Sequence, residues 1–71
     1  MEKTLSEQAF WIGYDEAAKR GTLIAPCVSE EMMEFVKKHS MGIGDSIPWF
    51  KAFNEGQARW FREETRQMLE Q

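Results

Sequence analysis

The chain has 71 residues, 13% of them aromatic, and nine Lys and Arg against twelve Asp and Glu give a net charge of −3. A chain this short hides only about 60% of its unfolded surface, so we expect one domain, residues 1–71, whose core is dense or shared with a second copy. The acidic balance argues against non-specific binding to nucleic acid or to a membrane surface, because both need a positive field.

The compartment is indicated by the single cysteine and by the first residues. Cys27 has no second cysteine to pair with, which favours a reducing environment, and we expect it to be a buried small hydrophobic residue. The sequence MEKTLSEQ lacks the hydrophobic run of a signal peptide, and no window approaches a membrane span. We therefore expect a cytoplasmic protein.

The first helix is predicted over residues 5–20. Thr4 and Glu7 form a capping-box pattern at its start, and Gly21 is the residue type that ends helices in the left-handed conformation. Its expected apolar side carries Phe10, Trp11, Tyr14, Ala17 and Ala18, with Leu5, Ala9 and Ile12 widening it.

The segment 22–28 is apolar without a period, and Pro26 favours an extended conformation at Ala25. We expect a connector tucked against the domain. Ser29 then caps a second helix over residues 30–39, with glutamates in its first turn and Lys37, Lys38 and His39 in its last, an order that suits the helix dipole.

Residues 40–46 contain two glycines and predict a turn, after which Asp45 or Ser46 caps a third helix over residues 47–70, with Pro48 in its first turn. One broad side of this helix carries Trp49, Phe50, Phe53, Gly56, Gln57, Trp60, Phe61 and Met68; the other carries Lys51, Glu55, Arg59, Arg62 and Arg66. Burial of these rings should be the largest favourable term in folding. The last turns, from about Glu63, are expected to project past the domain.

The fold class predicted is therefore all-α: a small three-helix domain with a long C-terminal amphipathic helix. The segments 9–13 and 52–56 both read A-F-x-x-G, each in the middle of a helix. A glycine there costs about 1 kcal/mol relative to alanine. Either the two glycines allow a close helix approach, with Gly13 and Ala17 receiving the rings of the third helix, or the echo is chance.

No group of residues predicts catalysis. His39 stands at a helix end, where its charge would complement the helix dipole. Cys27 has no histidine at a spacing that would mark a catalytic pair, and neither residue belongs to a metal-ligand pattern. The sequence MGIG lacks the lysine of a phosphate-binding loop. We expect no enzyme, no cofactor and no metal.

The candidate partner-binding residues are Trp49, Arg59, Trp60, Arg62 and Arg66. Arginine suits phosphate and carboxylate recognition, but Glu55 and Glu63 lie four residues from Arg59. Glu70 lies four residues from Arg66, and such i,i+4 pairs partly cancel the positive field. The arginine side is thus either a self-neutralised solvated face or a binding ridge. Three tryptophans are many for so small a core, so we expect at least one to lie partly exposed at a partner or dimer surface.

Two fragments carry a resemblance to a known family. They are Ala9-Phe10-Trp11-Ile12-Gly13-Tyr14, followed by Pro26-Cys27, and later Phe53-Asn54-Glu55-Gly56 with Trp60. Over about a third of the chain this resembles the bacterial ribosome modulation factor and its small relatives, which implies ribosome association and translational silencing. The order Pro26-Cys27, the extra middle helix and the acidic charge depart from that family.

The function expected is that of a small non-enzymatic regulator or inhibitor, bacterial or encoded by a phage or plasmid, that docks a helical surface on a protein partner. One alternative is an RNA- or ribosome-associated modulator that binds through the arginine ridge. A second alternative is a homodimer that completes its own core.

Overall fold

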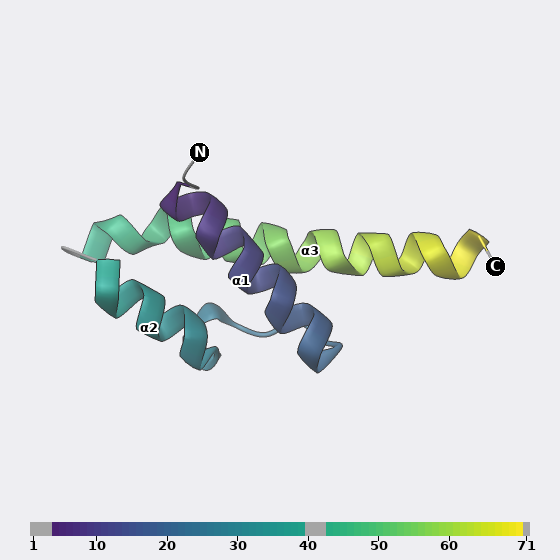
Figure 1. Ribbon diagram of the computed structural model, residues 1–71, viewed down its shortest axis with the longest axis horizontal. Helices are drawn as coiled ribbons and strands as arrows, with labels where there is room; N and C mark the ends of the chain where they lie inside the picture. The colour runs from purple at the N-terminus through teal and green to yellow at the C-terminus, as the bar shows by residue number, and fades with distance from the viewer. Residues whose placement is uncertain (1–3, 40–42, 71) are drawn as a thin grey trace.

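Three α-helices account for most of the residues that the computed structural model describes, 4–39 and 43–70, and no strand occurs among them. They are α1 (Leu5–Arg20), α2 (Glu30–His39) and α3 (Ile47–Glu70), with short 3-10 helices η1 (Pro26–Val28) and η2 (Ile43–Ser46) before α2 and α3. The all-α prediction is confirmed, and α1 crosses α3 while α2 lies beside the N-terminal half of α3 (Figure 1).

The helix ends follow the predicted local signals. The Thr4 hydroxyl accepts a hydrogen bond from the Glu7 amide at 3.1 Å, which caps α1. Gly21 ends that helix with φ of 67°, and its amide donates to the Ala17 carbonyl at 2.7 Å. The Ser29 hydroxyl accepts from the Met32 amide at 3.1 Å and caps α2.

Before α3 the predicted turn is only partly described. Residues 40–42 and the side chain of Asp45 lie outside the described part, and residues 43–46 form η2 rather than an open turn. Pro48 lies in the first turn of α3, where its missing amide hydrogen breaks no helical hydrogen bond.

The two A-F-x-x-G segments meet at the crossing of α1 and α3. A Cβ on Gly13 would collide with the main-chain carbonyl oxygen of Phe53 and lie 2.8 Å from its carbonyl carbon. A Cβ on Gly56 would collide with the carbonyl oxygen of Phe10 and lie 2.9 Å from its carbonyl carbon. Each glycine therefore admits the backbone of the other helix, which confirms the close approach. The expectation that Gly13 receives a ring of the third helix is wrong, because the main chain of Phe53 occupies that position.

The buried side of α1 is the small-residue side, not the ring side that hydrophobicity predicted. Ala9, Gly13 and Ala17 are buried, whereas Trp11 is 39% exposed and Ala18 is exposed. Small residues face α3 because they let the two backbones approach closely. The rings of Phe10 and Tyr14 are half-buried at the edges of this contact. Glu16 is buried in the same row, where Arg20 Nε donates to its carboxylate at 2.8 Å.

The core lies between all three helices, beside the N-terminal half of α3, and α1 contributes Ala9 to it. Phe53 and Met32 are completely buried, and Phe35 and Trp49 meet edge to face with ring centroids 5.4 Å apart. Burying side chains of this size supplies the main driving force for so short a chain. The outward side of α3, with Lys51, Glu55 and the three arginines, is exposed as predicted.

The connector between α1 and α2 is held at one residue. Gln57, 1% exposed, accepts a hydrogen bond from the Ile24 amide at 2.9 Å and donates to the Ile24 carbonyl at 3.0 Å. Ala25 is extended as predicted, with ψ of 145°. Pro26 is half-buried, and Cys27 is exposed. The prediction that Cys27 is buried is wrong: the hydrogen bonds to α3 are made at Ile24, and the thiol three residues later lies outside that contact.

Candidate docking surface

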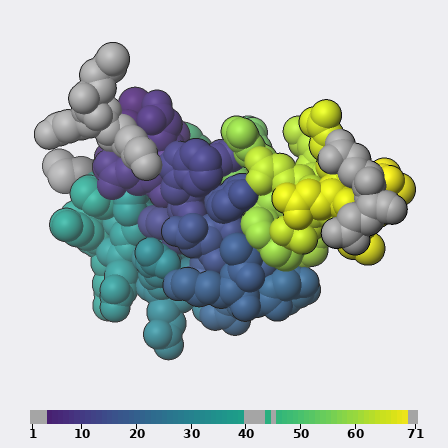
Figure 2. Space-filling view, turned by 45° about the vertical axis from the view of Figure 1, so that its right-hand side comes forward, coloured from purple at the N-terminus to yellow at the C-terminus, as the bar shows by residue number. Residues whose placement is uncertain are grey.

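The C-terminal half of α3 extends well past the crossing with α1. Figure 1 shows these turns leaving the body of the domain, and in Figure 2 α1 lies between α2 and this end of α3. Met68 is 74% exposed and Leu69 is 83% exposed. The expected projection of the last turns is confirmed, and it leaves large apolar groups at the surface.

A shallow hollow lies along this half of α3, with Leu23 of the connector facing it. Its volume is about 620 Å³. It is lined by Leu23, Ala58, Phe61, Arg62, Thr65, Arg66 and Leu69. The α3 members recur at helical spacing on the side that faces away from α1, and Ala58 and Thr65 keep the floor low between the larger groups.

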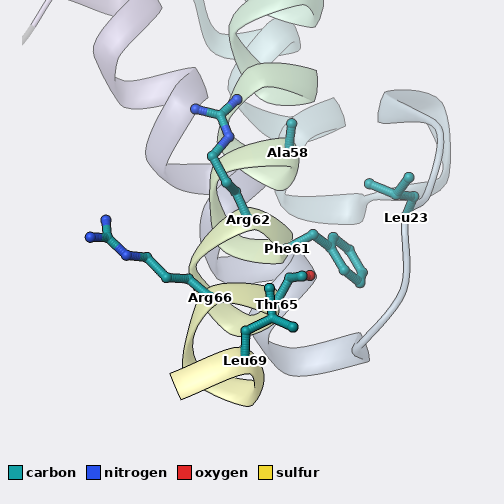
Figure 3. Close-up of a pocket in the computed structure, with 7 residues that line it drawn as sticks. All are labelled: Leu23, Ala58, Phe61, Arg62, Thr65, Arg66 and Leu69. Atoms are coloured by element: carbon teal, nitrogen blue, oxygen red, sulfur yellow. The ribbon is translucent and has the colours of Figure 1, made fainter. Parts of the chain in front are cut away.

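The hollow has an apolar side and a basic side. Figure 3 shows Phe61 turned toward Leu23 on one side of α3, with Arg62 and Arg66 extending to the other. Phe61 is half-buried, whereas Leu23 is 63% exposed. No carboxylate is among the lining residues. Within the described residues Arg62 has no ion-pair partner.

The other predicted arginine belongs to a different face. Arg59 Nε donates to the Glu63 carboxylate at 3.1 Å, and the Tyr14 hydroxyl donates to the same carboxylate at 2.5 Å. The hydrogen bond from Tyr14, followed by that from Arg59, lowers the pKa of Glu63; the same bond to Glu63, followed by loss of hydration, raises the pKa of Tyr14. This cluster ties α1 to α3 and occupies Arg59.

The two candidate tryptophans lie in different surroundings. Trp49 is 7% exposed and packs in the core against Phe35. Trp60 is half-buried and meets the ring of Phe61 edge to face, with centroids 4.7 Å apart. It therefore supports one wall of the hollow from behind. Trp11 is 39% exposed, so the expected partial exposure of one tryptophan is found, and its place at a partner or dimer surface stays a prediction.

Two of the five candidate residues thus come together, Arg62 and Arg66, and five lining residues are absent from the predicted site: Leu23, Ala58, Phe61, Thr65 and Leu69. Helical period places Phe61 on the apolar side of α3, and the apolar segment around Leu23 predicts only a connector. Nothing in the sequence places Leu23 beside a residue 38 positions later.

Other parts of the described surface offer less. A smaller hollow of about 340 Å³ on α2 is lined by Glu30, Met33, Glu34, Val36 and Lys37. His39 lies against Phe35, with ring centroids 4.7 Å apart. Across residues 4–39 and 43–70, no group of three or more His, Cys, Asp or Glu residues is placed to hold a metal ion.

None of the described helices combines the length and the apolar character needed to cross a membrane. Comparisons with protein-family models, with curated proteins and with solved structures find no match for this chain.

Proposed function

We propose that this protein is a non-enzymatic regulator or inhibitor that acts by docking the projecting half of α3 on a protein partner. The observation that carries this proposal is the hollow of Leu23, Phe61 and Leu69, which leaves large apolar groups exposed on a molecule of 71 residues. A contiguous exposed apolar patch with charged residues at its rim is typical of an interaction surface.

The arrangement of the domain also supports docking. The residues of the core cluster and of the α1–α3 crossing end at Gly56 on α3. The last turns of α3 take no part in either and can therefore contact another molecule. A rigid helix on a packed base loses little conformational freedom when it binds, which favours recognition of the helix-in-groove kind.

The test is a pull-down from the native cell with a double variant, Leu23→Ser with Leu69→Ser. Both side chains are exposed, so the fold should survive. The matched control is Val28→Ser with Ile47→Ser, which removes two other exposed apolar side chains, 54% and 56% exposed. Loss of the same protein partner in the first variant and its retention in the control support the proposal. Equal capture by both variants contradicts it.

The rival function is binding of RNA or the ribosome through Lys51, Arg59, Arg62 and Arg66, which are all exposed on α3. The ion pair of Arg59 with Glu63 weakens that ridge. A salt titration separates the two functions, because affinity for phosphates falls log-linearly with salt whereas a contact centred on apolar groups changes little.

A homodimer remains the third proposal. Sedimentation at micromolar concentration, under reducing conditions because Cys27 is exposed, tests it directly. A second copy on the hollow would make sedimentation depend on Leu23 and Leu69, and a concentration-independent monomer would exclude it.

A further inference from the structure

We infer that the hollow on α3 receives an acidic amphipathic helix of another protein. This inference rests on the proposed docking function and names the chemistry of the partner. Its basis is the combination of an apolar strip with two guanidinium groups along one edge and no carboxylate among the lining residues.

The size of the hollow fits a short helix. From Ala58 to Leu69 the helix α3 rises about 16 Å at 1.5 Å per residue, the length of three turns of a partner helix. Ala58 and Thr65 are the small lining residues of α3, and Phe61 and Leu69 are the large ones. Such an alternation accepts side chains that recur at i, i+3 or i+4 and i+7 on a docking helix.

The charge selects among helices. Arg62 and Arg66 lie four residues apart and therefore one turn apart on the same edge of the hollow. Two carboxylates one turn apart on the partner match this spacing, and guanidinium groups suit carboxylates in two-pronged hydrogen bonds. A partner helix with lysines at these places would meet like charge.

A second copy of this chain fits less well. In a two-fold dimer that places the hollows face to face, the arginine edges meet each other when the helices are antiparallel and meet the apolar edge of the other copy when they are parallel. In neither arrangement do the lining residues supply a carboxylate to the arginines. Like charges across an interface suppress the wrong pairing. The charge therefore favours a partner different from this chain.

The probe is a fluorescently labelled 18-residue synthetic peptide with leucines at i, i+3, i+4 and i+7 and glutamates on both flanks. Its twin carries lysine in place of each glutamate. Fluorescence anisotropy against the full chain should show tighter binding of the acidic peptide, by about tenfold or more at low salt. Equal affinity of the twins, or no binding of the acidic peptide at millimolar protein, overturns the inference.

Variants of the lining residues test whether the acidic peptide binds in the hollow. Arg62→Glu with Arg66→Glu should abolish the preference for the acidic peptide, and Leu69→Ser should weaken its binding about tenfold or more. The control Lys37→Glu with Lys38→Glu makes the same change in net charge on α2, where both lysines are exposed, and should keep the preference. Equal loss in that control also overturns the inference.

The remaining occupants are outcomes of the same experiment. Tighter binding of a 20-nucleotide single-stranded RNA than of the acidic peptide, or sedimentation as a dimer that Leu69→Ser dissociates, overturns the acidic helix as occupant. If the pull-down still depends on Leu23 and Leu69 while the acidic peptide does not bind, the docking function stands and only the partner chemistry is wrong.

Discussion

Gly13 lies directly against the main-chain carbonyl of Phe53, and this contact sets how closely α1 and α3 approach. The reverse contact, Gly56 against the carbonyl of Phe10, repeats it with the roles of the helices exchanged. The crossing therefore has an approximate two-fold relation between the segments 9–13 and 52–56. Each helix interior accepts a glycine because the neighbouring backbone takes the place of a side chain.

The first prediction concerns these two glycines. Gly13→Ala and Gly56→Ala should each lower the free energy of unfolding by about 1–3 kcal/mol, although alanine by itself favours a helix by about 1 kcal/mol. The cause is that the added Cβ meets backbone, which cannot rotate away. Urea unfolding followed by circular dichroism measures the loss. Gly44→Ala is the control, because a Cβ there meets nothing within 4 Å, and it should change stability by less than about 0.5 kcal/mol. A stabilised Gly13→Ala would refute the close approach.

The second prediction concerns the two hydrogen bonds between Gln57 and the main chain of Ile24 in the connector. Gln57→Leu should lower the free energy of unfolding by about 1–3 kcal/mol, because the partly buried amide and carbonyl of Ile24 lose their partners. Amide hydrogen exchange should show the Ile24 amide losing protection ahead of the helices. Gln57→Glu distinguishes the two bonds: it retains an acceptor for the Ile24 amide but sets a carboxylate against the carbonyl. An unchanged exchange rate of the Ile24 amide in both variants would disprove these hydrogen bonds.

The third prediction follows from the pKa shifts at Tyr14 and Glu63. The hydrogen bond lowers the pKa of Glu63 in the folded state, so its contribution to stability is present above the ordinary carboxyl pKa and is lost as pH falls through the folded value. It raises the pKa of Tyr14, so that contribution is present below the ordinary phenol pKa and is lost as pH rises through the folded value.

Tyr14→Phe should therefore flatten the dependence of stability on pH in both windows, below about pH 4.5 and above about pH 10. Denaturant titrations at several pH values, paired with Arg59→Gln, provide the measurement. Arg59→Gln removes the second donor to Glu63 and should weaken the acid window. It also removes a positive charge that lowers the pKa of Tyr14, so the alkaline window should persist and move to higher pH, whereas Tyr14→Phe abolishes it. A Tyr14→Phe profile parallel to that of the unaltered chain would count against the hydrogen bond.

The fourth prediction separates the tryptophans. Trp49→Ala should cost about 3–5 kcal/mol and leave little folded protein, since the ring is buried against Phe35. Trp11→Ala should cost less, because that side chain is 39% exposed. Thermal unfolding of the two variants compares them, and equal melting temperatures would contradict the assigned core.

The helix boundaries were predictable because their signals are local. Thr4, Ser29 and Gly21 act within three or four residues of themselves, so the sequence contains the whole cause. The buried side of α1 was not predictable from hydrophobicity, which ranks Trp11 above Gly13. The repeated A-F-x-x-G pattern indicated a close approach at Gly13, but that the main chain of Phe53 lies there is seen only in the structure.

The candidate site was predictable only on one helix. Arg62 and Arg66 are grouped by helical period along α3, whereas the same pattern places Phe61 on the other, apolar side. The wall formed by Leu23 comes from the connector. That wall depends on the hydrogen bonds between Gln57 and Ile24, a pairing 33 residues apart for which the sequence has no local sign.

The exposed thiol of Cys27 gives every molecule one attachment point for a chemical label. Cys27 lies in η1, three residues beyond Ile24, and no other cysteine competes for a maleimide dye. A fluorophore placed there sits outside the core, on the segment whose position Gln57 fixes. Its emission can therefore report release of the connector from α3 in real time, apart from the unfolding of the helices themselves.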